Sequence, residues 1–147
     1  MATKEQVHGC IIKGDVEGLR NLGDLSAVIN ETIPTTCPEG AYSLLFSAAG
    51  FDNLEIVKIL LDTQGIVVDQ GVGLIVFCNF CGFEFVFSKS IVKWGNEDSP
   101  LYNSLRRKNF ALAKLLLRAG ATIDSSVRSF IDIDIDKLNE EALAESN

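Results

Sequence analysis

The sequence predicts an all-α fold, namely a solenoid of helix-turn-helix repeats with a capping segment at each end. The prediction depends on two segments, 43–61 and 99–117, which superpose without a gap at a constant offset of 56 residues. Their second halves share six apolar positions and one lysine, Lys58 and Lys114. Internal repetition of this kind is typical of architectures in which each unit buries its apolar faces only against its neighbours.

Each copy is expected to contain two short helices. Ser99-Pro100 is a helix start, because the serine oxygen can accept free backbone N–H groups and proline suits the first turn. Asn53 and Asn109 precede a second helix in each copy and can cap it in the same way. The second helices, 54–61 and 110–117, are apolar on most of their circumference, so we expect them to be buried between neighbours. Gly65 and Gly120 are expected to end them.

The residues of both copies resemble a known repeat family. Ser99-Pro100-Leu101-Tyr102 stands where ankyrin repeats begin with Thr-Pro-Leu-His, and 54–61 is close to the second helix of that family. The segment 115–124, Leu-Leu-Leu-Arg-Ala-Gly-Ala-Thr-Ile-Asp, resembles the family's Leu-Leu-Leu-x-x-Gly-Ala-x-Val-Asn exit. The chain therefore resembles the ankyrin repeat family, with about four repeats of which the first and third are degenerate.

This resemblance implies one repeat domain over residues 1–147. At an offset of 38, Gly14–Leu22 matches residues 52–60, which suggests an N-terminal capping repeat followed by a lengthened loop over 30–40. The expected units are a capping repeat over 1–30, a repeat over 41–70, a degenerate shortened repeat over 71–98, a repeat over 99–124, and a C-terminal cap with an acidic tail over 125–147.

Two segments leave alternatives open. Within 71–98 we favour helices, the first over about 74–81, because a strand in mid-stack would break the stacking; the alternative is a strand, because Phe83, Phe85 and Phe87 alternate with other residues. The segment 130–136 alternates isoleucine with aspartate, which favours an extended segment with one apolar face. Residues 137–146 are expected to form a last short helix.

Composition and charge exclude several classes of protein. The net charge of −7 argues against nucleic-acid binding, which depends on cations that neutralise phosphates. The longest uncharged apolar run, 71–83, is too short to span a bilayer, and the first residues lack the apolar stretch of a secretory signal. We therefore expect no membrane contact and a cytoplasmic location, whether in the protein's own cell or in a host.

The charge is unevenly distributed along the chain. Residues 131–147 carry six acids and one base, whereas 105–118 carry five cations and no acid. One interpretation is a solvated helix face followed by a solubilising tail. The other is a bipolar surface that orients a charged protein partner.

The candidates for chemistry are few. Cys78 and Cys81 form a C-x-x-C pair, which redox and zinc sites also contain, but they lie in an apolar run without a second pair, so core packing is the preferred interpretation. The spacing of Asp132, Asp134 and Asp136 begins like a calcium loop, but Lys137 stands where such loops need glycine. His8 is the only histidine and is assigned a local role in the N-terminal cap. We expect no metal, no cofactor and no catalysis.

The resemblance to ankyrin repeats implies a binding protein that grips a partner protein with the concave side of its stack. A stoichiometric inhibitor or decoy is one such role, because 147 residues leave no room for an effector domain. The alternatives are a self-associating assembly protein, based on the apolar 71–87 and the alternating 130–136, and a thiol or zinc protein that uses Cys78 and Cys81. The expected partner-binding residues are Tyr42, Phe51, Asp69, Gln70, Asp98, Tyr102, Arg106, Arg107 and Lys108.

Overall fold

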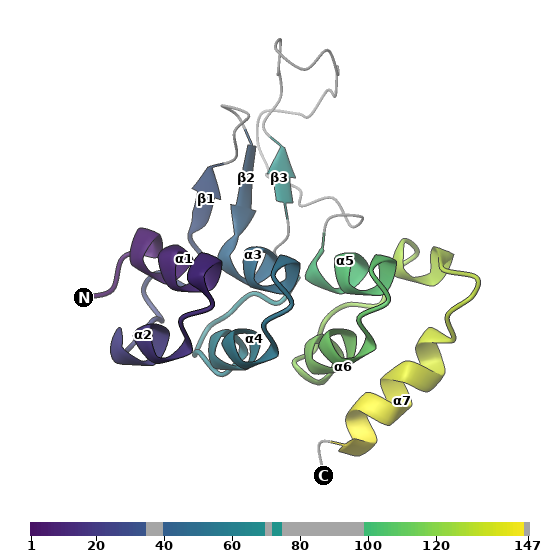
Figure 1. Ribbon diagram of the computed structural model, residues 1–147. Helices are drawn as coiled ribbons and strands as arrows, with labels where there is room; N and C mark the ends of the chain where they lie inside the picture. Colours follow the sequence, from purple (N-terminus) through teal and green to yellow (C-terminus); the bar gives the residue numbers. More distant parts are fainter. Residues whose placement is uncertain (35–39, 70–71, 75–98, 146–147) are drawn as a thin grey trace.

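The computed structural model describes residues 1–34, 40–69, 72–74 and 99–145, and these residues are mostly helical, in agreement with the predicted all-α class (Figure 1). In chain order the elements are α1 (Lys4–Lys13), α2 (Val16–Asn21), β1 (Thr32–Pro34), β2 (Gly40–Ser43), α3 (Leu44–Gly50), α4 (Leu54–Leu61), β3 (Val72–Leu74), α5 (Pro100–Arg106), α6 (Phe110–Arg118), the short 3-10 helix η2 (Val127–Ser129) and α7 (Ile135–Glu145).

Six of the described helices form three helix hairpins, and these pairs lie side by side. The first helices α1, α3 and α5 make one row, and the second helices α2, α4 and α6 make a parallel row beneath it (Figure 1). Each helix contacts its partner in the pair and the corresponding helix of the next pair. The buried apolar residues of the three pairs and of α7 form one core cluster, so each pair is stabilised mainly by its neighbours.

The same capping arrangement begins the helices of all three pairs. In each case the N-cap side chain accepts a hydrogen bond from the backbone N–H three residues later, which satisfies one of the free donors of the first turn. The N-cap residues are Thr3, Ser43 and Ser99 for the first helices and Asp15, Asn53 and Asn109 for the second. The helix starts predicted at Ser99, Asn53 and Asn109 are therefore confirmed.

A left-handed residue joins the two helices of each pair. Gly14, Asp52 and Lys108 have φ values of 66°, 56° and 56°, at the same place relative to the following N-cap. Only glycine adopts this region without steric cost, so Asp52 and Lys108 are held there by the surrounding structure.

Matching side chains also connect consecutive pairs through their exit loops. Asn30 Oδ1 accepts from the N–H of Val67 (2.8 Å), and Asp69 Oδ1 accepts from the N–H of Thr122 (2.9 Å). Asp69 Oδ2 also accepts from the Thr122 hydroxyl (2.6 Å), and the Asn30 amide donates to the Gly65 carbonyl (2.7 Å). We call these contacts the loop ties, because each one joins the loop after one second helix to the loop after the next.

Three short strands form an antiparallel sheet in the order β1-β2-β3, which projects from the row of first helices (Figure 1). Ile33 pairs with Tyr42, and Ala41 pairs with Gly73. The prediction of a loop over 30–40 is therefore corrected in part, because Thr32–Pro34 pairs with β2 as a strand.

The segment 71–98 lies mostly outside the described residues, and of its expected helix over about 74–81 the structure describes only Leu74, at the end of β3. Helix α3 packs directly against α5, and α4 directly against α6.

The C-terminal part differs from its prediction. The extended segment predicted over 130–136 is wrong, because Ile131 and Asp132 form a turn and Ile135 begins α7. Asp134 accepts a hydrogen bond from the N–H of Lys137 (3.0 Å) and so starts the helix. Ile135, Leu138 and Ala142 are buried at helical spacing, and this burial outweighs the two-residue alternation. The short last helix predicted over 137–146 is confirmed with an earlier start.

We predict that Asp69→Ala lowers the free energy of unfolding by about 1–2 kcal/mol, because it removes the charged acceptor of two hydrogen bonds that Thr122 donates. The measurement is urea unfolding followed by circular dichroism. The matched control is Glu140→Ala, an exposed acid on α7, which should change the stability by less than about 0.5 kcal/mol. Equal stabilities of the two variants would show that the loop tie contributes nothing.

Candidate functional site

An aromatic row crosses the three first helices. His8, Phe46 and Tyr102 are half-buried, and each lies six residues before the left-handed residue of its pair. Tyr42 on β2 extends the row beside α1, and its ring centroid lies 5.7 Å from that of His8. Phe130 extends it beyond α5, with its ring centroid 5.0 Å from that of Tyr102. Aromatic pairs at these separations are mutually stabilising, so the row is held in place before any partner binds.

His8 is a structural member of this row. Its Nε2 lies 3.1 Å from the Tyr42 hydroxyl, and burial lowers the pKa of the imidazole below its ordinary value of 6.5. At neutral pH the ring is therefore uncharged, and its Nε2 can accept a hydrogen bond from the Tyr42 hydroxyl when the ring proton is on Nδ1. The predicted local role of His8 takes the form of a contact between α1 and the strand that precedes α3.

The turns at the far ends of the first helices carry a second set of exposed side chains, Ile12, Lys13, Gly50, Phe51 and Arg106, which we call the turn edge. Ile12 is 52 % exposed and Phe51 is 54 % exposed, which is high for apolar side chains of this size. Arg106 donates to Asn103 (3.0 Å), and neither Arg106 nor Lys13 forms an ion pair within the part of the chain that the structure describes. Their charges are therefore available to an outside group.

Four of the expected partner-binding residues lie on these two surfaces. Tyr42 and Tyr102 belong to the aromatic row, and Phe51 and Arg106 belong to the turn edge. Gln70 and Asp98 lie outside the described residues.

The other three expected residues are engaged within the chain. Asp69 forms a loop tie with Thr122. Lys108 is the left-handed residue of the third pair, and its Nζ lies 3.6 Å from a carboxylate oxygen of Asp132. The side chains of Asp69 and Lys108 therefore bond to other segments of the same chain.

Arg107 joins the third helix pair to the second. Its Nη1 donates to the carbonyls of Ala49 (3.1 Å) and Gly50 (2.9 Å) at the C-terminal end of α3, and its Nη2 pairs with Asp52. A cation at this place satisfies carbonyls that have no partner inside the helix. Arg107 therefore stabilises the stack, whereas its neighbour Arg106 donates to Asn103 of its own helix.

The basic segment and the acidic tail are paired with each other. Lys114 Nζ lies 2.7 Å from Glu145 and 3.3 Å from Glu141, and Arg118 Nη2 lies 2.6 Å from Glu145. Hydrogen bonding to Glu145 raises the pKa of Lys114, and hydrogen bonding to Lys114 lowers the pKa of Glu145. Much of the predicted bipolar surface is therefore neutralised where α7 covers α6.

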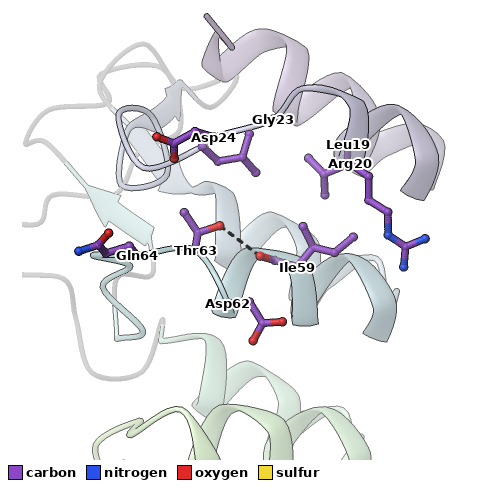
Figure 2. Close-up of a pocket in the computed structure, with 9 residues that line it drawn as sticks. Leu19, Arg20, Gly23, Asp24, Ile59, Asp62, Thr63 and Gln64 are labelled. Carbon is purple, nitrogen blue, oxygen red and sulfur yellow. Dashed lines mark hydrogen bonds between the residues drawn. The ribbon is translucent and has the colours of Figure 1, made fainter.

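The second-helix row has a wide, open groove between α2 and α4 (Figure 2). Leu19 and Ile59 form its apolar base, and Thr63 donates its hydroxyl proton to the Ile59 carbonyl (3.1 Å). Arg20 on its rim is paired with Glu17 and Glu55. Asp24, Asp62 and Gln64 also line this groove, and all three are exposed to solvent.

The residues considered for metal or thiol chemistry are dispersed or undescribed. Cys78 and Cys81 lie outside the described residues, and burial raises the pKa of the partly buried Cys10 thiol. Within the described ranges, no three His, Cys, Asp or Glu side chains are grouped so as to hold a metal ion. Asp132, Asp134 and Asp136 have three different partners, respectively Lys108, the backbone N–H of Lys137, and Arg128.

Comparison with protein-family models, curated proteins and solved structures finds no significant match for this chain. Among the described helices, none has the length and apolar character that crossing a membrane requires.

The sequence interpretation missed six residues of these surfaces. Most could have been found by extending the 38-residue offset back from Gly14, which places Ile12 opposite Gly50 and His8 opposite Phe46. Phe130 had no such signal, because it follows the last helix pair. The residues missed are His8, Ile12, Lys13, Phe46, Gly50 and Phe130.

We predict that the pKa of His8, the only histidine, lies below 6.5 in the folded protein, because its burial disfavours the imidazolium. A pH titration of the imidazole proton signals by NMR gives the value without assignment ambiguity. A pKa at or above 6.5 would contradict the half-buried position of the ring.

We predict that Arg107→Ala lowers the free energy of unfolding by about 1–2 kcal/mol, because it removes hydrogen bonds to the end of α3 and the pair with Asp52. The neighbouring Arg106→Ala, which loses one hydrogen bond within its own helix, to Asn103, should change it by less than about 0.5 kcal/mol. Urea unfolding of both variants makes the comparison. Similar effects of the two would contradict the assignment of Arg107 to the stack.

Proposed function

We propose that this chain is an ankyrin-like repeat protein that binds a partner protein through its row of first helices and catalyses no reaction. The repeated caps, left-handed turns and loop ties support the repeat architecture, because they recur at equivalent places of consecutive helix pairs. A stack of this kind presents an extended surface on which corresponding side chains lie in rows.

The observation that carries the proposal is the aromatic row together with the turn edge. Half-buried tyrosine, phenylalanine and histidine side chains lie across three adjacent helices, with the exposed side chains of Phe51 and Arg106 beside them. Large aromatic side chains and arginine provide much of the binding energy of protein interfaces, and rigid ones lose little entropy on binding. Binding of this kind acts by covering the partner's surface, as a stoichiometric inhibitor or decoy does.

Self-association is the second candidate function. The fully exposed Ile131 and the partly exposed Phe110 favour it, because exposed apolar side chains can pack against another copy. Light scattering over a range of concentrations tests this alternative; a mass of one chain at the highest concentration would exclude it.

We predict that a double variant of the turn edge, Phe51→Ala with Arg106→Glu, loses the partner while the fold is retained. Both side chains are exposed, and the hydrogen bond of Arg106 stays within α5, to Asn103. Affinity capture from the native cell, quantified by mass spectrometry, should show proteins retained by the wild type and lost at least about tenfold by the variant.

The matched control is Lys137→Glu on α7, an exposed cation without a side-chain partner among the described residues, which should retain the same proteins as the wild type. If all three baits capture the same proteins in equal amounts, the proposed surface is wrong.

A further inference from the structure

The turn edge lacks a side chain at its centre, at Gly50, and we call this position the notch. Ile12, Gly50 and Arg106 each lie two residues before the left-handed residue of their pair, so they occupy equivalent places on three adjacent helices. A Cβ atom built on Gly50 would meet no other atom within 4 Å. The side chains of Ile12 and Arg106 therefore stand on either side of a position that has no side chain, with the exposed Phe51 next to it.

The three helix ends form one continuous surface. The Arg107 guanidinium bonds to the Gly50 carbonyl (2.9 Å) and so holds the end of α5 against the end of α3. On the other side, a Cβ atom on Gly14 would lie 3.6 Å from the Asn53 amide nitrogen, which places the first turn against the second. The notch is thus bordered by groups whose positions the stack fixes.

The unpaired charge at this edge is positive, although the whole chain carries −7. Lys13 and Arg106 have no ion pair within the described residues. The two nearby acids are occupied, because Asp15 caps α2 and Asp52 bonds to Arg107 and Asn109. Asp15 and Asp52 keep their negative charges when they accept these bonds, but Lys13, Arg106 and Arg107 outnumber them, so a segment that carries carboxylates would meet a net positive charge here.

We propose that the turn edge binds an acidic segment of the partner protein, which inserts one apolar side chain into the notch at Gly50. This inference depends on the proposed function and specifies the chemistry of its partner. The apolar side chain packs between Ile12 and Phe51, and carboxylates of the same segment pair with Lys13 and Arg106. Burial of an apolar anchor supplies affinity, and the flanking ion pairs fix the orientation.

A protein segment fits this edge better than a polyphosphate or an anionic membrane. Affinity for nucleic acid grows with the number of phosphates neutralised, and this edge supplies two unpaired cations on a chain of negative net charge. The exposed Ile12 and Phe51, by contrast, need an apolar side chain to cover them.

The test uses a displayed library of random short peptides selected on the full chain, followed by fluorescence anisotropy with the best selected peptide as the probe. We expect selected peptides that combine several acidic residues with one large apolar residue. We also expect their affinity to fall as salt is added, because the ion pairs are exposed.

Gly50→Tyr is the deciding variant, since a Cβ atom at this position meets no atom of another helix within 4 Å and the added ring would cover the notch. It should weaken binding of the probe at least about tenfold, and Arg106→Glu should do the same. The matched control is Ala144→Tyr, at an exposed position of α7 away from the turn edge, which should leave the affinity unchanged. Circular dichroism melting of each variant shows that the fold is retained.

Several outcomes would overturn the inference. Selection of neutral or basic peptides, failure to select any peptide, or equal affinity for wild type and Gly50→Tyr would each do so. Tighter binding of single-stranded DNA or of phosphatidylserine vesicles than of the peptide would assign the edge to another class of partner. If the cell capture still depends on Phe51 and Arg106 in that case, only the stated chemistry of the partner fails and the proposed function stands.

Discussion

The structure depends on keeping consecutive helix pairs in register. The second helices are apolar on most sides, and Ile56, Val57 and Leu60 of α4 are buried where α4 packs against α2, α3 and α6. A pair that slid against the next would expose this surface, at a cost of about 25 cal/mol for each Å² of apolar area. The loop ties prevent sliding at one edge of the stack, and Arg107 prevents it at the opposite edge. The hydrophobic effect supplies the driving force, and these directional bonds select one arrangement.

The same bonds determine which charges remain for a partner. Asp52, Asp69 and Arg107 are polar and partly exposed, yet each bonds to a neighbouring pair. On the C-terminal side, α7 covers α6 and neutralises Lys114 and Arg118. A chain with many charged residues thus retains few unpaired charges near the first helices, and those at the turn edge are positive. Net charge is therefore a poor guide to the charge that a partner meets here.

The elements that were predicted correctly are those whose signals are local. The caps at Ser99, Asn53 and Asn109, the second helices and the last helix all follow from a few adjacent residues. The error at 130–136 arose because a two-residue alternation was weighed without the N-cap at Asp134. The roles of Asp69 and Arg107 could not be predicted in this way, because their partners lie more than fifty residues away in the sequence. Binding residues were predicted only where the resemblance to ankyrin repeats indicated an exposed position, and this criterion does not separate Arg106 from Arg107.

Comparison among the three helix pairs separates stacking positions from the rest. Where a residue caps a helix or ties two loops, the pairs use the same chemistry, such as Asn30 and Asp69 at the loop ties. At the notch position they use Ile12, Gly50 and Arg106, which differ in size, polarity and charge. A position with a stacking role accepts a narrow range of side chains, whereas a position that faces outward can differ from pair to pair. The variety at the turn edge is therefore consistent with freedom from stacking, and an irregular surface of this kind can match an irregular partner segment in shape and charge.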